Sequence, residues 1–237
     1  MPVSVEGIPV SGRRALAALV ELAGPGRPVW LVGGALREMV SGRAAGDLDL
    51  AVVGGALDLG RRVADRLDAA FVVLDVARGA GRILGRSGDV AMDLVDLRAP
   101  TLEGDLRARD FTVNALAAPL RDLLRDGRVE LVDPTGGLGD LERRLVRVCA
   151  PTAIVDDPVR ALRGVRLAMR PGWRLTPETE RAIAEGAARL AGVSPERQRD
   201  ELVGILSEPS AGAGLRTLDR LGVLPVLLPE SGAMRAT

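Results

Sequence analysis

A chain of 237 residues with 47% hydrophobic and 27% charged residues can form one large or two small globular domains. It contains no histidine, lysine or tyrosine, which excludes Ser-His and Cys-His nucleophiles, a lysine Schiff base and a phosphate-loop lysine. The 32 basic residues are all arginines and balance 32 acidic residues, so the net charge gives no indication of nucleic-acid binding. The aromatic content of 2% excludes a base-stacking platform.

Targeting and cross-linking signals are also lacking in the sequence. No apolar run approaches the roughly 18 residues of a membrane helix, and the first residues lack a signal-peptide pattern. We therefore expect a cytoplasmic protein without membrane contact. The single cysteine, Cys149, excludes an intrachain disulfide and a cysteine-built zinc site.

The first part of the chain alternates helical and strand patterns. Ser11 is expected to cap the first helix, which ends near Gly24. Further helices are expected over 35–41 and 56–67, and strands over 28–32, 47–53, 70–76, 81–86 and 90–98. Several links between strands are too short for helical crossovers, so the pattern predicts a mixed sheet of the α+β class.

The pattern changes after the stretch DPTGGLGDLERRLVRV. From about Thr152 onward the apolar spacing is helical, with further helices expected over 177–191, 195–207 and 211–221. We therefore expect two domains, a mixed α+β head over 1–139 and an all-helical unit over 140–237.

Two carboxylates mark the start of one strand. Asp47 and Asp49 are two residues apart, so on a strand their side chains point to the same face and repel each other unless a cation lies between them. Carboxylates together with substrate phosphates suit magnesium. The alternative is an ordinary solvated strand entrance.

An anion site is predicted just upstream. Gly33 and Gly34 end an apolar strand and start a helix, where backbone N–H groups can bind phosphate, and Arg37 follows one turn later. The alternative is a tight strand-to-helix turn without a ligand.

A third carboxylate is expected from the stretch VAMDLVDLR. Asp93 lies among apolar residues on a predicted central strand, where a charge needs partners. Asp96 is the competing candidate, and by alternation only one of the two can share a face with Asp47 and Asp49. An exposed edge strand is the alternative reading.

Two later stretches carry weaker signals. The stretch DLRARDFTVNALA places polar groups among apolar residues, either as the wall of a site or as a helix start. Asp157 and Arg160 are three residues apart, which places them on one face of a helix. There Asp157 can accept a hydrogen bond from the edge of a nucleotide base and Arg160 can donate one to it. The alternative is an ordinary ion pair between the two.

Six stretches in order resemble one family, the class II tRNA nucleotidyltransferases (CCA-adding enzymes) and bacterial poly(A) polymerases of the DNA polymerase β-like superfamily. The resemblance runs from about Val29 to Pro229. The stretches that carry it are LVGGALRE, DLDLAV, LEGDLRARDFTVNALA, DPTGGLGDLERRLVR, DDPVRALRGVRLAM and SPERQRDELVGIL.

This resemblance implies a catalytic head and a helical neck that add CMP or AMP from CTP or ATP to the 3′ end of tRNA and release pyrophosphate. Asp47 and Asp49 would bind two Mg²⁺ ions, and Asp93 would be the further catalytic carboxylate. The Gly33–Gly34 turn and Arg37 would hold the triphosphate.

The resemblance also implies which residues recognise the nucleoside. Arg109 and Asp110 would contact the ribose, with Asn114 in support. Asp157 and Arg160 would read the base, so that the protein rather than a nucleic-acid template selects the nucleotide.

Arg163 and Arg197 would support these contacts. The sequence departs from the family pattern at Glu38, Asp156 and Ala108, where the family usually has Asp, Glu and Arg. The family's body and tail regions, which grip the RNA, have no counterpart, so a further RNA-binding region or a partner chain is expected.

The resemblance leaves the exact activity open. A poly(A) polymerase, or an enzyme that adds only CC or only A, would use the same helix. A non-catalytic nucleotide-binding subunit is the alternative from another class, although the intact Asp47 and Asp49 pair argues against it.

Overall fold

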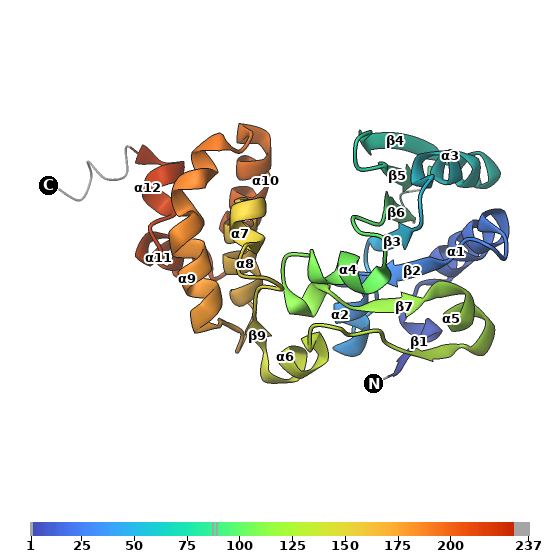
Figure 1. Cartoon of the computed structure of the whole chain (residues 1–237), viewed down its shortest axis with the longest axis horizontal. Helices are drawn as coiled ribbons and strands as arrows, with labels where there is room; N and C mark the ends of the chain where they lie inside the picture. Colours follow the sequence, from blue (N-terminus) through green and yellow to red (C-terminus); the bar gives the residue numbers. More distant parts are fainter. Residues whose placement is uncertain (1, 87, 89, 230–237) are drawn as a thin grey trace, which may run out of the picture. The chain divides into compact units, whose positions relative to one another are not determined.

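The computed structural model describes residues 2–86, 88 and 90–229 and divides into two compact units (Figure 1). The first contains the residues up to 108 together with 113–138, and the second contains 109–112 and the residues from 139 onward. The second unit thus includes four residues that precede the change in sequence pattern.

A six-stranded sheet forms the centre of the first unit, in the order β4-β5-β6-β3-β2-β7. The strands are β2 (Val29–Val32), β3 (Leu48–Val52), β4 (Ala70–Asp75), β5 (Ala80–Leu84), β6 (Ala91–Asp96) and β7 (Ala117–Pro119). β3 and β6 are parallel, and the other neighbouring pairs are antiparallel. This arrangement confirms the predicted mixed sheet and the α+β class. A separate two-stranded sheet pairs β1 (Pro2–Ser4) with β8 (Arg128–Glu130).

Helices cover one face of the sheet. They are α1 (Val10–Ala23), α3 (Ala56–Leu67) and α5 (Leu120–Asp126), while α2 (Gly34–Val40) and α4 (Leu102–Arg107) lie in connections. α3 packs on β4, β5 and β6, α5 packs on β2 and β7, and α1 contacts both helices (Figure 1).

Strand alternation separates the apolar and polar faces of the sheet. A Cβ added to Gly81 would lie 3.3 Å from Leu57 of α3, so Gly81 faces the helices and the next residue, Arg82, faces away from them. Ile83 and Leu94, on the side of Gly81, are fully buried. Arg82 and the residues in register with it, Asp93 and Asp49, therefore lie on the opposite face.

One predicted helix start is wrong. α1 begins at Val10 after Pro9, and Pro9 supplies no side-chain cap. Ser11 consequently lies inside the first turn and does not cap the helix. The fixed φ of proline suits the start of a helix, which agrees with Pro9 directly preceding Val10.

The second unit is mainly helical. After α6 (Gly137–Arg143), its helices are α7 (Ala153–Asp156), α8 (Arg160–Ala168), α9 (Pro177–Gly186), α10 (Pro195–Leu206), α11 (Ala211–Arg220) and α12 (Leu224–Leu227). A 3₁₀ helix over Ala187–Gly192 continues α9. Two short parallel strands, β9 (Leu145–Val146) and β10 (Arg174–Leu175), lie beside them.

Phe111 explains why residues 109–112 belong to the second unit. Its ring is fully buried, and a Cβ added to Gly164 of α8 would lie only 2.8 Å from it. The backbone of Phe111 also forms a bridge with Val148. Residues 109–112 are therefore anchored in the core of the helical unit.

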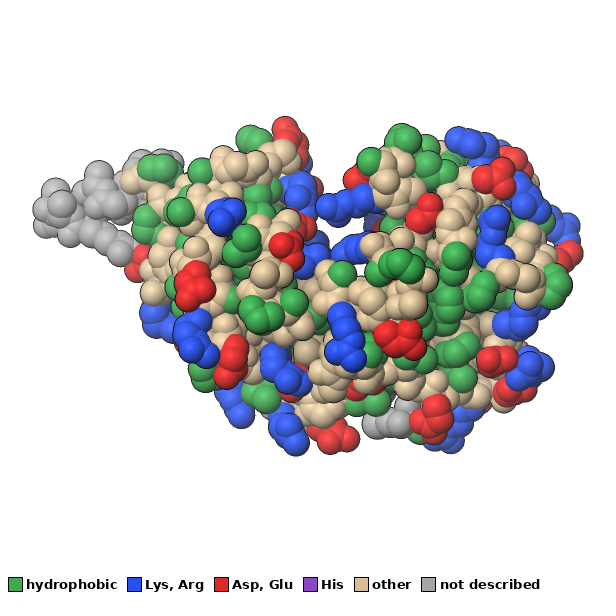
Figure 2. Space-filling view, in the orientation of Figure 1, with side chains coloured by type: hydrophobic (Ala, Val, Ile, Leu, Met, Phe, Trp, Pro, Cys, Tyr) green, Lys and Arg blue, Asp and Glu red, His purple; other side chains and the backbone are tan. Residues whose placement is uncertain are grey.

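Charged side chains are scattered over both units without a dominant sign on the visible face (Figure 2), in keeping with the zero net charge. None of the helices within the described ranges has the length and apolar character needed to cross a membrane.

Candidate functional site

A row of charged residues crosses three neighbouring strands on the polar face of the sheet. Asp49 on β3 pairs in register with Asp93 on β6, and Asp93 pairs in register with Arg82 on β5. Directly opposite residues on adjacent strands place their side chains side by side on one face. The two predicted carboxylates, Asp49 and Asp93, are therefore neighbours in the sheet, although 44 positions separate them in the chain.

Arg82 binds Asp93 through both ends of its guanidinium fork. Its Nε lies 2.6 Å from Asp93 Oδ1 and its Nη2 lies 2.7 Å from Asp93 Oδ2. Arg82 Nη2 also lies 3.6 Å from Asp47 Oδ2. The hydrogen bond to Asp93 raises the pKa of Arg82 above its ordinary value, and the charges of Asp93, Asp47 and Asp49 act in the same direction.

Asp47 lies in a bend just before β3, outside the strand that was expected to contain it, and its side chain is 63% exposed. Within the described ranges, no three carboxylates, thiols or imidazoles converge as a metal site. The donor set nevertheless suits a hard divalent cation, because it consists of partly exposed carboxylates on one face that already attract a cationic group.

Asp96 has a different position from Asp93. Its Oδ1 accepts a hydrogen bond of 2.8 Å from the backbone N–H of Ala56, the first residue of α3. Asp96 thus stabilises a helix start, and Asp93 is the β6 carboxylate that shares a row with Asp49.

The glycine turn is shaped by the nearby Asp49. Gly33 has φ +73°, and a Cβ added there would lie 2.8 Å from Asp49 Oδ2. Both the backbone conformation and the close carboxylate require glycine. The N–H of Gly33 donates to the Leu116 carbonyl at 3.4 Å, which engages one of the N–H groups expected to bind phosphate.

The side chain of Arg37 binds two other residues of the first unit. Its side chain is 11% exposed, forms an ion pair of 3.0 Å with Glu38, and donates a hydrogen bond to Asn114 Oδ1. Arg37 and Asn114 were expected to contact different parts of the nucleotide. The structure shows that they also contact each other.

The expected ribose group is divided between the two units. Asn114 belongs to the first, whereas Arg109 and Asp110 belong to the second. Asp110 is buried, its Oδ1 accepts from the N–H of Phe111 at 2.8 Å, and its Oδ2 pairs with Arg163 at 3.2 Å.

Asp110 is part of a partly buried ionic network. Glu201 on α10 pairs with Arg163 and with Arg166 on α8, each at 2.9 Å. Burial lowers the pKa of Arg163, but the charges of Asp110 and Glu201 more than offset this and raise it above its ordinary value. The network fixes α8 to α10 and to the segment that contains Asp110.

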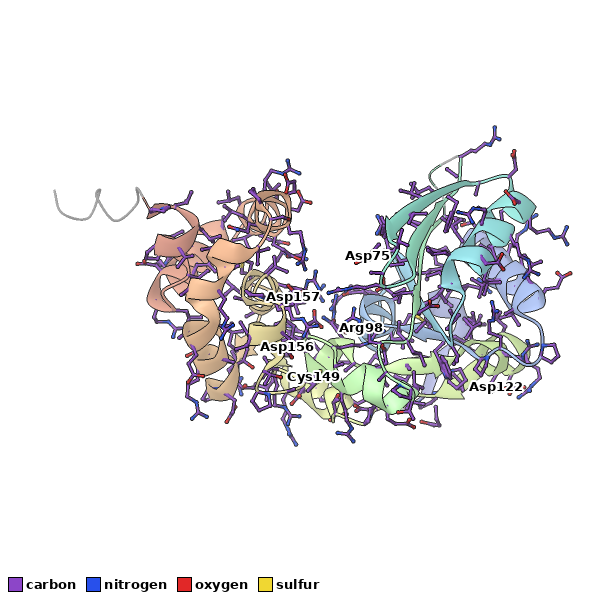
Figure 3. The ribbon with its side chains drawn as sticks, turned by 45° about the horizontal axis from the view of Figure 1, so that its top comes forward. Asp75, Arg98, Asp122, Cys149, Asp156 and Asp157 are labelled. Carbon is purple, nitrogen blue, oxygen red and sulfur yellow. The ribbon has the colours of Figure 1, made fainter. Side chains whose placement is uncertain are left out.

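The expected base-reading pair is not on one helix. Asp157 follows α7 in an extended conformation, and α8 begins at Arg160. The reason is Pro158, because a residue before proline avoids the helical region. The expectation of an i, i+3 pair on one helix face is therefore wrong, although Asp157 Oδ2 still lies 3.9 Å from Arg160 Nε. Figure 3 labels Asp156 and Asp157 at this junction.

Arg197 on α10 is the close partner of Asp157. Its Nη2 donates to both carboxylate oxygens, at 3.0 and 2.8 Å. Arg160 is buried and donates instead to the carbonyls of Ala153 and Arg109, at 3.2 and 3.4 Å. The predicted base-reading carboxylate and its predicted supporting arginine are thus in direct contact.

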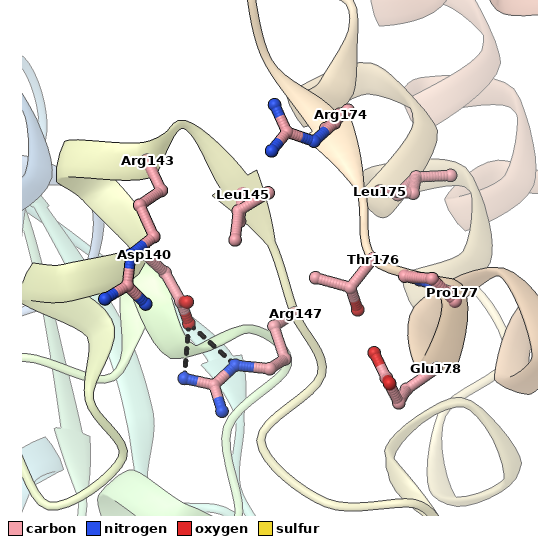
Figure 4. A pocket seen from close by; sticks show the side chains of 9 residues that line it. All are labelled: Asp140, Arg143, Leu145, Arg147, Arg174, Leu175, Thr176, Pro177 and Glu178. Carbon is pink, nitrogen blue, oxygen red and sulfur yellow. Dashed lines mark hydrogen bonds and ion pairs between the residues drawn. The ribbon is translucent and has the colours of Figure 1, made fainter.

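A separate open pocket of about 400 Å³ lies in the second unit (Figure 4). Its charged lining mixes both signs: Asp140, Arg143, Arg147, Arg174 and Glu178. Asp140 is buried and accepts from Thr112 and from Arg147, so part of this charge is neutralised within the wall.

Sequence reasoning missed Arg82 and Glu201. Arg82 alternates with Gly81 and Ile83, a signal for an exposed strand position, but its carboxylate partners depend on the strand register. Glu201 follows Arg163 by 38 residues, so only the packing of α10 on α8 brings the two together.

Comparison with known proteins identifies the family. Residues 29–147, half of the chain, match the family described as the poly A polymerase head domain. The chain belongs to this family. Residues 172–234 match a second model, described as "Probable RNA and SrmB- binding site of polymerase A".

Curated relatives of this chain carry tRNA nucleotidyltransferase names. An "A-adding tRNA nucleotidyltransferase" of Deinococcus radiodurans is 43% identical over 205 residues, covering 84% of this chain and 45% of the relative. A "CC-adding tRNA nucleotidyltransferase" of Geobacter sulfurreducens is 37% identical over 196 residues, covering 83% and 44%. The chain thus spans about half the length of the curated relatives it matches.

A solved structure shares the fold of this family member. The "Thermotoga maritima CCA-adding enzyme complexed with tRNA_CCA" aligns with a TM-score of 0.78 and 30% identity, covering 91% of this chain and 52% of that one.

Proposed function

We propose that this member of the poly A polymerase head family is an RNA nucleotidyltransferase that adds CMP or AMP, from CTP or ATP, to the 3′ end of tRNA. The observation that carries the proposal is the row of Asp49 and Asp93 on adjacent strands, with Asp47 just before β3. The names of the relatives from Deinococcus and Geobacter support tRNA as the substrate.

We assign Asp47 and Asp49 as the residues that would hold two Mg²⁺ ions, with Asp93 as the further catalytic carboxylate. Bound magnesium supplies Lewis-acid stabilisation of the reacting phosphate oxygens and makes the attacking hydroxyl more acidic. The protein's own part is to hold two carboxylates on a rigid sheet and a third directly before β3, which limits reorganisation when charge develops on the phosphates.

The nucleotide contacts belong to the same proposal. The Gly33–Gly34 turn and Arg37 would hold the triphosphate. Because the N–H of Gly33 already donates to the Leu116 carbonyl, the N–H of Gly34 would be the backbone donor to phosphate. Arg109, Asp110 and Asn114 would act at the ribose, and Asp157 with Arg160 at the base, with Arg163 and Arg197 in support.

The buried environment of Asp110 favours a positioning role for it, because its carboxylate is shared between Arg163 and the backbone N–H of Phe111. Arg197 has the same kind of role toward Asp157, since it holds both carboxylate oxygens.

An enzyme that adds only A or only CC, or a poly(A) polymerase, is the second candidate. The similarity to both an A-adding and a CC-adding relative favours a tRNA-directed enzyme without choosing between these activities.

The experiment that tests the proposal presents three tRNAs, ending before CCA, after C and after CC, to the protein with Mg²⁺. Labelled CTP and ATP are supplied separately, and the products are resolved by length. We expect addition in a defined pattern that names the specificity. Absence of addition to all three tRNAs would contradict the proposed activity.

A further inference from the structure

Arg82 is the residue of the polar sheet face for which the proposed reaction has no role. It extends from β5 across the sheet toward the carboxylates, with its side chain 35% exposed. Both ends of its fork bind Asp93, and the same Nη2 reaches toward Asp47. The guanidinium therefore contacts two of the three carboxylates that the proposed metal site requires.

The carboxylates on the polar face of the sheet need a nearby positive charge also when no metal ion is bound. Carboxylates directly opposite each other on adjacent strands repel, and a nearby positive charge removes this repulsion. Arg82 supplies such a charge in the same register row. A planar guanidinium also holds a carboxylate in one orientation when it binds through two parallel hydrogen bonds.

We propose that Arg82 is a positioning residue that acts as the resident counter-ion of Asp93 and Asp47, and that it competes with divalent cations for these carboxylates. This inference rests on the proposed metal site. It is carried by the contacts of Arg82 with Asp93 at 2.6 Å and with Asp47 at 3.6 Å.

The competition has two consequences. Metal binding must weaken at least part of the Arg82 contacts, so the arginine lowers the affinity of the site for divalent cations. In the absence of metal, the same contacts stabilise the sheet, so loss of Arg82 should leave a protein that depends more strongly on metal for its stability.

The test compares the wild-type protein with Arg82→Gln and Arg82→Lys. Mn²⁺ is the probe, and free Mn²⁺ is followed by electron paramagnetic resonance in the absence of nucleotide. Arg86→Gln is the matched control, because Arg86 follows β5 and forms an exposed ion pair of 2.6 Å with Asp68, which is not one of the three carboxylates. The variant Asp49→Ala shows how much of the Mn²⁺ binding depends on the carboxylates of the sheet.

We expect Arg82→Gln to bind Mn²⁺ about fivefold more tightly, the factor that corresponds to an ion pair of about 1 kcal/mol. Arg82→Lys should return the affinity toward the wild-type value, because it restores the charge. The melting temperature of Arg82→Gln should be lower than that of the wild type without metal, and Mg²⁺ should raise it by a larger increment. Arg86→Gln should match the wild type in both measurements.

Two contrary results are distinguishable. If Asp49→Ala removes the Mn²⁺ binding but Arg82→Gln binds Mn²⁺ as the wild type does, or more weakly, the counter-ion role is wrong while the metal site stands. If Asp49→Ala binds Mn²⁺ as well as the wild type does, both the metal site and the role of Arg82 are overturned.

Discussion

At the scale of single residues, the candidate site consists of charges whose partners are already within the protein. Asp93 is bound by Arg82, Asp157 by Arg197, and Arg37 by Glu38 and Asn114. Charges paired in this way keep a defined geometry before substrate arrives. A substrate or metal ion must then compete with an internal partner, which favours ligands that carry strong charge of their own.

Asp157 offers a prediction at this scale. Asp157→Ala should relax the choice of base by about tenfold or more, because a side chain that accepts a hydrogen bond from the correct base rejects bases that lack the donor. Incorporation of UTP and GTP relative to CTP and ATP measures the effect. Asp200→Ala is the control, since Asp200 is an exposed acid on α10 that pairs with its neighbour Arg199. An unchanged preference in Asp157→Ala would argue against the base-reading role.

At the scale of secondary structure, the turn between β2 and α2 determines where Asp49 can lie. Gly33 adopts a positive φ and leaves space for the Asp49 carboxylate. The register of β3 on β6 then sets Asp49 beside Asp93. A short turn and one parallel strand pair thus build the centre of the proposed site.

The turn can be tested with two glycines of equal φ. Gly33→Ala should cost about 3 kcal/mol of unfolding free energy, since both the backbone conformation with φ +73° and ψ −142°, which only glycine adopts readily, and the contact with Asp49 oppose a Cβ. Gly42→Ala should cost only about 1 kcal/mol, because Gly42 has φ +73° but open space around it. Equilibrium urea unfolding measures both values. An equal loss of unfolding free energy in both variants would show that the Asp49 carboxylate does not oppose a Cβ at position 33.

The helical unit supplies a second comparison. Glu201→Gln should destabilise the protein by about 2 kcal/mol or more, because Glu201 is buried and neutralises both Arg163 and Arg166. Glu180→Gln should cost less than about 1 kcal/mol, since the pair of Glu180 with Arg220 is more exposed. Urea unfolding again gives both values, and an equal loss would contradict a special role for the network.

The sequence predicted local features better than distant partners. Apolar patterns identified β2, β3 and β6. Alternation along β6 left Asp93 and Asp96 as competing candidates, and the family resemblance favoured Asp93 before any strand pairing was known. The short strands β7, β9 and β10 could not be predicted, because two or three residues carry too little pattern and depend on their neighbours.

The site residues show the same limit. Arg37 and Asn114 are 77 residues apart, Arg163 and Asp110 are 53 apart, and Arg197 and Asp157 are 40 apart. Each pairing arises from tertiary packing, which no local pattern encodes. Pro158, in contrast, was visible in the sequence and already disfavoured a continuous helix through Asp157.

At the scale of the whole molecule, the chain combines a nucleotidyltransferase-type sheet with a helical unit and spans about half the length of its curated relatives. Its zero net charge and 2% aromatic content provide little general attraction for RNA. We therefore expect the nucleotide chemistry to depend on the carboxylate row and the selection of RNA to depend on further contacts.

The most direct measurement of the central claim compares CMP and AMP incorporation into tRNA by the wild-type protein and by Asp49→Ala, with Mg²⁺ present. We predict that Asp49→Ala loses incorporation by about a thousandfold or more, because Asp49 would hold a Mg²⁺ ion that stabilises charge on the reacting phosphate, while its melting temperature stays close to that of the wild type. Incorporation by Asp49→Ala near the wild-type rate would contradict the assignment of the carboxylate row as the catalytic centre.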